Sequence, residues 1–247
     1  MTDVAQAQDK PLPIPIPVLL SFVAGYVDSY TYLGLFGLFA AQVTGSFVIA
    51  GAEFVSHDYG VAGKLLAILA FLVAAALTAA LIAVARNAQR TALPLTLGLE
   101  AALLAVFCAI MLYGPPIAGA TDRHGIIAGL FAAMAMGAQS VLVRLLMKGI
   151  PQTNVMTGNM TQLGIATTDL IIAWRRLQRG RHDAAAYRRF AEVRRQLVVV
   201  GSIALGFLGG AASGAGAFAI IGLRGAVLAV AVVAALAAWA VYREQSG

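Results

Sequence analysis

Two acidic side chains lie well inside long apolar runs of the sequence. Asp28 stands in a stretch rich in glycine and tyrosine, and Glu100 stands among leucines and alanines. A charged group near the centre of a bilayer costs about 3 kcal/mol or more, so such residues are protonated, paired or in contact with water. The chemistry that fits both is the release and rebinding of a proton during transport. The alternative is a hydrogen bond to a neighbouring helix that only fixes the packing.

Two segments rich in hydroxyls and amides interrupt the apolar pattern, and each contains a Thr-Gly pair. They read QVTGSFVIAGAE at 42–53 and NVMTGNMTQLGIATTD at 154–169. Thr, Ser and Asn cap helix starts, glycine permits a close backbone approach, and the free N–H groups of a helix start attract anions and polar ligands. We therefore predict a ligand site where two such helix starts meet near the membrane midplane. The alternative is tight helix packing through small residues.

The predicted ligand-binding residues come from these two segments and from two neighbouring helices. Gln139 is included because it lies close to the position in the second half that corresponds to Asp28; it either lines the same cavity or bonds between helices. The set is Asp28, Gln42, Thr44, Gly45, Ser46, Gln139, Asn154, Thr157, Gly158, Asn159 and Gln162, with Asp28 and Glu100 as the proton-coupling residues.

The remaining reactive side chains form no catalytic or metal-binding pattern. His57, His124 and His182 are scattered over predicted loops, and Cys108 is the single cysteine. The sequence has no GxSxG, HExxH or phosphate-loop motif, and no base stands beside a Thr or Ser nucleophile. We predict that the protein is not an enzyme and needs neither a metal nor a cofactor.

The composition places these residues in a membrane. Of the 247 residues, 60% are hydrophobic and 11% are charged, whereas soluble domains carry about 25% charged residues. Several apolar runs of about 20 residues are long enough to span a bilayer as helices. The net charge of +6 comes from basic groups at the ends of these runs and in one Arg-rich stretch, which indicates topology signals rather than nucleic-acid binding. Residues 1–17 predict an extended, proline-rich tail without a cleavable signal peptide.

The runs divide into two halves with the same order of features: long helix, Thr-Gly break, loop, long helix, long helix. The halves are residues 18–113 and 125–242, and the second contains a basic insert at 175–196. If each break crossed the membrane, eight spans would put Arg86 and Arg144 outside, against the preference of basic loops for the cytoplasm. If each break enters and leaves on one side, six spans remain and the basic residues all lie inside.

Three spans in each half would invert the second half relative to the first, as in many transporters. The fold prediction is therefore an all-α integral membrane protein with six transmembrane helices and two short re-entrant helices in an inverted 3+3 repeat. Both termini are expected in the cytoplasm. Residues 182–196 predict an amphipathic helix on the inner leaflet, with anionic lipid headgroups as partners at Arg175–Arg195. Glycines at 206, 210 and 214 predict close helix packing, within the subunit or across a homodimer.

Four short motifs occur in a fixed order: GYVDS at 25–29, QVTGS at 42–46, MGAQS at 136–140 and VMTGNMT at 155–161. They resemble the GxxDA…TGN and MGxQNA…VxTGxxT patterns of the YoaK-like bacterial membrane proteins, classed as domain of unknown function 1275. Ser46, Ser29 and Ser140 stand where Asn, Ala and Asn are usual in that family. The resemblance covers about residues 18–242 and implies a multi-pass protein of the bacterial inner membrane, without an established activity.

These observations predict a small secondary transporter or channel for an anion or small polar solute, coupled to protons through Asp28 and Glu100. Helix N-termini favour negative charge, which is the reason for expecting an anion. The alternative is a non-transporting membrane scaffold or stress-response component whose Thr-Gly breaks serve only helix packing.

Overall fold

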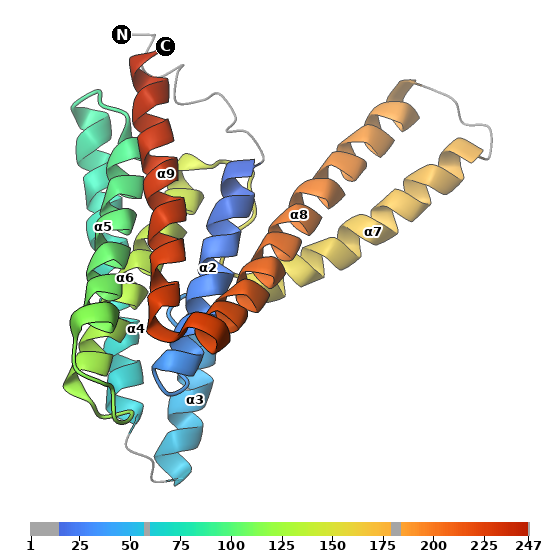
Figure 1. Cartoon of the computed structure of the whole chain (residues 1–247). Helices are drawn as coiled ribbons and strands as arrows, with labels where there is room; N and C mark the ends of the chain where they lie inside the picture. The colour runs from blue at the N-terminus through green and yellow to red at the C-terminus, as the bar shows by residue number, and fades with distance from the viewer. Residues whose placement is uncertain (1–14, 57–59, 179–183, 247) are drawn as a thin grey trace.

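The computed structural model describes residues 15–56, 60–178 and 184–246, and the regular structure of these residues is entirely helical. The chain forms α2 Pro15–Gly34, α3 Val43–Ser56, α4 Val61–Asn87, α5 Ala92–Tyr113, α6 Arg123–Leu146, α7 Met156–Gln178, α8 Ala184–Ile221, the 3-10 helix η1 Gly222–Gly225 and α9 Ala226–Gln245 (Figure 1).

Four helical segments of the described residues are long and apolar enough to cross a membrane. They are α4, α5, α6 and the stretch Ala184–Gln245, which contains α8, η1 and α9. The helix α3 is apolar but has only 14 residues, too few to span the roughly 30 Å hydrocarbon core of a bilayer. The all-α class and the membrane character predicted from the sequence are thus confirmed.

Helices α2 and α8 run parallel and pack at backbone contact. A Cβ atom on Gly206, Gly210 or Gly214 would overlap the backbone carbonyl of Val18, Phe22 or Tyr26, respectively, all on α2. The contact is reciprocal, because a Cβ on Gly25 of α2 would overlap the Phe207 carbonyl of α8. The three glycines of α8 thus serve helix packing, as predicted, and they do so within one subunit.

Helices α4 and α6 form a second parallel pair of the same kind. A Cβ on Gly137 of α6 would overlap the Phe71 carbonyl of α4. Near the ends of both helices, the Arg86 guanidinium donates a hydrogen bond of 2.9 Å to the Leu145 carbonyl. Each long helix of the first half therefore has its closest neighbour in the second half, so neither half forms a bundle alone.

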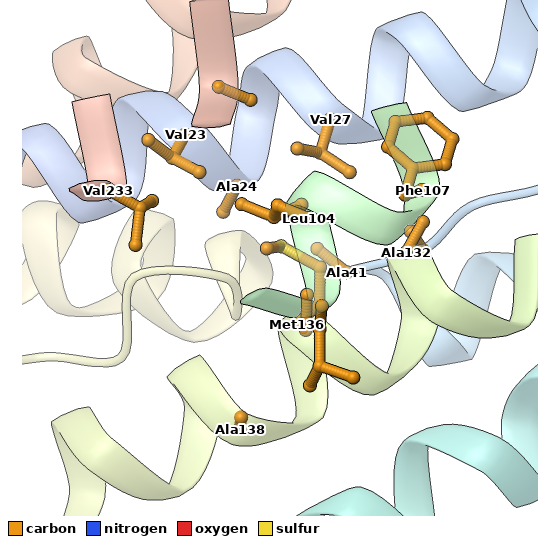
Figure 2. Packing of buried hydrophobic residues seen from close by; sticks show 14 of the residues in the cluster. Val23, Ala24, Val27, Ala41, Leu104, Phe107, Ala132, Met136, Ala138 and Val233 are labelled. Carbon is orange, nitrogen blue, oxygen red and sulfur yellow. The ribbon is translucent and has the colours of Figure 1, made fainter. Parts of the chain in front are cut away.

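The main hydrophobic core lies where α2, α5, α6 and α9 meet. In Figure 2, Leu104 of α5 lies between Ala24 of α2 and Met136 of α6, and Val233 of α9 lies close by. These four side chains are almost completely buried. Helices α2 and α6 are antiparallel. Gln139, late in α6, contacts Leu20, early in α2, whereas Gly129, early in α6, faces Leu38, just after the end of α2.

Helix α7 and the first half of α8 project sideways from this bundle as a two-helix arm (Figure 1). The predicted re-entrant helix of the second half is therefore not short, because α7 continues for 23 residues through its Arg-rich end. The separate amphipathic helix predicted at 182–196 is also wrong. From Ala184 this segment is the start of α8, a single helix of 38 residues without a proline to interrupt it.

Two helix starts also depend on local chemistry. Helix α2 begins at Pro15, three residues before the predicted start of the first run, because proline in the first helical turn lacks only an N–H that would have no intrahelical partner. The predicted tail otherwise lies outside the described residues. Asp122 caps α6 by accepting a hydrogen bond of 2.8 Å from the His124 backbone N–H. That bond holds the pKa of the Asp122 carboxyl below its usual value.

Candidate functional site

The Thr-Gly segments themselves are mostly helical, and the irregular backbone lies directly before each helix, at residues 35–42 and 147–155, which we call the first and second breaks. The first break is partly buried and is held against α2 by the Asp28 side chain. The backbone N–H of Ala41 donates to Asp28 Oδ1 at 2.6 Å, and that of Gln42 donates to the same oxygen at 3.4 Å. These N–H groups lie just before α3, where a helix start attracts negative charge. The Asp28 side chain itself therefore accepts the N–H groups at this helix start.

The second break, at residues 147–155, is held by three helices around Thr153. The Ser21 hydroxyl of α2 donates to the Thr153 carbonyl at 3.0 Å and to the Ile203 carbonyl of α8 at 2.8 Å. Gln139 Nε2 of α6 donates to Thr153 Oγ1 at 2.8 Å and to the Leu20 carbonyl at 2.9 Å. Thr153 and Asn154 are buried, so this part of the irregular backbone is covered by protein, whereas Lys148, Gly149 and Val155 are exposed.

The two breaks share a hydrogen-bond pattern at the same sequence spacing. Ser46 Oγ donates to the Phe39 carbonyl at 2.8 Å, and Asn159 Nδ2 donates to the Gln152 carbonyl at 2.7 Å. Both bonds reach back seven residues, from the first turn of α3 or α7 to the break before it. In each case a polar side chain two residues after the threonine of the Thr-Gly pair fixes the backbone that leads into the helix.

The predicted ligand-binding residues differ in burial. Asp28, Gln139, Asn154, Ser46 and Asn159 are buried. Thr44, Thr157 and Gly158 are exposed, and Gln42, Gly45 and Gln162 are half-buried. Helix α3 packs on α4 and helix α7 packs on α8, with no extended packing of α3 on α7. The starts of α3 and α7 therefore lie apart from each other, and α2 connects the two breaks that lead into them.

The breaks touch α2 at two positions on one face. Ser21 and Asp28 are seven residues apart, which is about 10 Å along a helix and almost two full turns. A movement of α2 along its axis would therefore change both breaks at once.

Glu100 lies in the core at the level of the second break. It is completely buried, and neither carboxyl oxygen has a hydrogen-bond partner in the described residues. Leu104, one turn later on α5, packs against Met136 of the antiparallel α6 (Figure 2). Gln139 lies nearly one turn after Met136, so Glu100 and Gln139 come to the same height in the bundle.

Most of the buried polar atoms without a partner in the described residues are carboxylate or amide oxygens, which accept hydrogen bonds. Within the described residues they include Asp28 Oδ2, both oxygens of Glu100, Gln139 Oε1 and Asn154 Oδ1. A buried acceptor without a donor costs about 1–3 kcal/mol. The interior therefore favours a group that brings protons, namely a protonated carboxyl or a solute with hydrogen-bond donors.

Sequence reasoning missed a buried ion pair beside the first break. Lys64 Nζ of α4 lies 2.6 Å from Glu53 Oε1 of α3 and donates to the Phe36 carbonyl at 3.1 Å. The Lys64 side chain is 2% exposed and that of Glu53 17%. Lys64 stands at the start of an apolar run, where a basic residue is common. The signal available was its place 11 positions after Glu53, the acidic end of the first Thr-Gly segment.

No group of three or more His, Cys, Asp or Glu side chains suited to a metal ion occurs in the part of the chain that the structure describes.

Ser21 and Thr153 are the other residues that sequence reasoning missed. Ser21 had no distinguishing signal, because one serine in a transmembrane run is common. Thr153 stands directly before the predicted Asn154, and only the fold shows that it is the centre of the second break.

Long apolar helices around two buried, irregular segments define the molecule as a multi-pass α-helical membrane protein. Comparison with family models assigns it further: the chain belongs to the family described as "Protein of unknown function (DUF1275)", whose model matches residues 16–240. The family predicted from the motifs is thereby confirmed, while the YoaK-like name stays a prediction. No curated protein and no solved structure matches the chain.

Proposed function

We propose that this protein is a small secondary transporter or channel of the bacterial inner membrane that carries a small polar solute together with protons. The observation that carries the proposal is the pair of partly buried irregular segments within an apolar helical bundle, next to buried acceptor oxygens without partners among the described residues. Irregular backbone at membrane depth occurs where protein or a water-filled cavity covers it, and in transporters it builds the substrate site.

The topology that we propose has six spans, formed by α2, α4, α5, α6, α8 and α9, with α3 and the first part of α7 re-entrant. The ends of α4, α6 and α9 lie at the same end of the bundle as the start of α2, and the tip of the arm reaches that end too (Figure 1). The last turns of α4, α6, α7 and α9 carry Arg86, Arg144, Arg176 and Arg243, respectively. The preference of basic residues for the cytoplasm then puts this end inside.

An inverted repeat accounts for the symmetry of the packing. Helix α2 would correspond to α6, α3 to α7, α4 to α8 and α5 to α9. The parallel pair α2–α8 then corresponds to the parallel pair α6–α4, and Gly25 to Gly137. The seven-residue hydrogen bonds of Ser46 and Asn159 correspond as well. Because α2 and α6 are antiparallel, the two halves have opposite orientations.

Cysteine labelling tests this topology. In a Cys108→Ala background, Arg90→Cys and Arg224→Cys place single thiols at opposite ends of the bundle. A membrane-impermeant maleimide added to intact cells should label Arg224→Cys only. Labelling of Arg90→Cys from outside would reject the six-span arrangement with the basic end inside.

The two carboxylates take different roles in this proposal. Asp28 is a positioning residue, because its carboxylate holds the backbone that leads into α3. Glu100 is the proton carrier, because it is buried without a partner at the level of Gln139. The cargo is a solute with hydrogen-bond donors rather than an anion, since Asp28 Oδ1 already accepts the N–H groups at the first helix start and the nearby buried oxygens lack donors.

Proteoliposomes with a trapped pH-sensitive dye test the proton coupling. Addition of a transported solute should change the internal pH, and Glu100→Gln should abolish that change while solute exchange continues. Asp28→Asn keeps an oxygen acceptor for the Ala41 N–H, so it should reduce the rate but keep the coupling. Proton movement that persists in Glu100→Gln would remove Glu100 from the mechanism.

The non-transporting scaffold remains the second candidate, and one observation favours it. The hydrogen bonds of Ser21 and Gln139 tie the second break to α2 and α6, as packing contacts would. A scaffold predicts that no solute in a broad screen changes either the thermal stability of the purified protein or the internal pH of the proteoliposomes. A solute that changes both would exclude it.

A further inference from the structure

A cleft of about 390 Å³ separates α7 from α8 near the tip of the arm. Farther down, the two helices touch closely, with Leu163 of α7 against Gly201 of α8. Toward the tip the facing residues include Ala173, Ala185 and Ala186, whose side chains are too short to close the space. The volume lies in the range of small-ligand sites, about 300–1,000 Å³.

Among the described residues, two arginines and one aspartate line the cleft. Arg176 comes from α7 and Arg189 from α8, on opposite sides. Arg189 Nη2 lies 3.7 Å from Asp169 Oδ2, and both side chains are substantially exposed, at 62% and 43%. A pair of this length in water contributes little, so it leaves the Arg189 guanidinium available to a stronger acceptor.

The surroundings add further positive potential. Residues 169–178 and 184–196 contain six arginines and two carboxylates. The cleft also opens at the first turn of α8, where the helix macrodipole is positive. Two guanidinium groups facing one space are suited to a phosphate group, because each can donate two parallel hydrogen bonds to its oxygens.

We propose that the cleft between α7 and α8 is a binding site for a phosphate group, held between Arg176 and Arg189 and separate from the two breaks. The apolar wall at Ile172 accommodates the organic part of a phosphate ester. The tip of the arm lies at the same end of the molecule as the ends of α4, α6 and α9 (Figure 1), so the phosphate is either that of a lipid headgroup or that of a soluble ester.

The test uses the full-length protein in nanodiscs and compares two variants with the same change in net charge. Arg176→Gln/Arg189→Gln removes both guanidinium groups of the cleft. Arg194→Gln/Arg195→Gln removes two arginines of the same arm that do not line it. In a Trp239→Phe background, Trp174 is the single tryptophan and lies next to the lining residue Ala173, so its emission reports occupancy.

Two probes distinguish the sources of the phosphate. Glycerol 3-phosphate is titrated into phosphatidylcholine nanodiscs, and phosphatidylglycerol is introduced in place of part of the phosphatidylcholine, with retained lipid counted by native mass spectrometry. The cleft variant should weaken binding of at least one probe by about tenfold or more, because charge-assisted hydrogen bonds are lost. The Arg194/Arg195 control should bind within about threefold of the starting protein.

An uncharged change gives an independent result. Ala185→Leu fills part of the cleft without altering the charge and should also weaken binding, with solute transport unchanged. Equal losses in the cleft variant and the Arg194/Arg195 control would show diffuse electrostatic attraction and overturn the proposal. Binding of neither probe, or full binding in Ala185→Leu, would overturn it as well.

Discussion

The two helix hairpins that follow the breaks, α3–α4 and α7–α8, have the same design but different surroundings. Each begins with a Thr-Gly pair in the first turn, and in the described part of each an ion pair joins the two helices. In the first hairpin the pair is Glu53–Lys64, at 2.6 Å and buried. In the second it is Asp169–Arg189, at 3.7 Å and exposed.

The two ion pairs constrain their hairpins to different degrees. A buried ion pair must keep both partners, because an unpaired charge in an apolar interior is costly. The first hairpin is thereby fixed to the break through the bond from Lys64 to the Phe36 carbonyl. An exposed pair imposes no such constraint, and the second hairpin continues through an Arg-rich segment as the arm.

Removing one partner of the buried pair should have the largest effect. Lys64→Met leaves the Glu53 carboxylate without its counter-charge and should lower the free energy of unfolding by about 3–5 kcal/mol. Denaturant unfolding in detergent micelles measures the change. The double variant Lys64→Met/Glu53→Leu should recover most of the loss, because no unpaired charge remains. A double variant no more stable than the single one would contradict this account of the pair.

The backbone contacts at Gly25 and Gly137 should be the next most sensitive features. Gly25→Ala would push α2 away from α8, and Gly137→Ala would push α6 away from α4. Each should lower the free energy of unfolding by about 1–3 kcal/mol. Gly209→Ala and Gly98→Ala are matched controls, because a Cβ there meets nothing within 4 Å. They should be neutral or stabilise by up to about 1 kcal/mol through helix propensity. Similar effects at all four positions would contradict the packing argument.

The paired hydrogen bonds of the two breaks should give moderate and equal effects. Ser46→Ala and Asn159→Ala each leave a break carbonyl without its donor and should cost about 1 kcal/mol. Thr167→Ala, which removes an exposed hydroxyl on α7, should change stability by less than about 0.5 kcal/mol. A loss confined to one of the two breaks would show that they are not equivalent.

The exposed pair of the arm should contribute least. Asp169→Asn should change the unfolding free energy by no more than about 0.5 kcal/mol, because water screens a pair of this length. The same unfolding assay at low and high salt measures it, and any effect should shrink as salt rises. A loss as large as that of Lys64→Met would mean that the two hairpins are stabilised in the same way.

Much of the fold followed from local sequence signals. The apolar runs predicted the long helices, because a bilayer requires continuous apolar segments of that length. The Thr-Gly pairs predicted helix starts, and α3 begins at Val43 and α7 at Met156, one residue before each threonine. The spacing of Gly206, Gly210 and Gly214 predicted a close helix contact, which the structure finds against α2.

The arm was predicted poorly because its polarity and its helical continuity are separate properties. Charged residues indicated a water-facing segment and hence a helix distinct from the membrane span. Arginine, alanine and glutamate are nevertheless good helix formers, so nothing ends α8 between Ala184 and Ile221.

The sequence by itself determined that this is a helical membrane protein with two Thr-Gly helix starts and that it carries the motifs of its family, because apolar length, capping residues and motif order are local properties of a chain. Tertiary structure alone decided the partners: α2 with α8, α4 with α6, Lys64 with Glu53, and Asp28 with the backbone before α3. It also decided that Glu100, unlike Asp28, meets no partner among the described residues. Such pairings depend on which distant segments come together in space, and no local pattern contains that information.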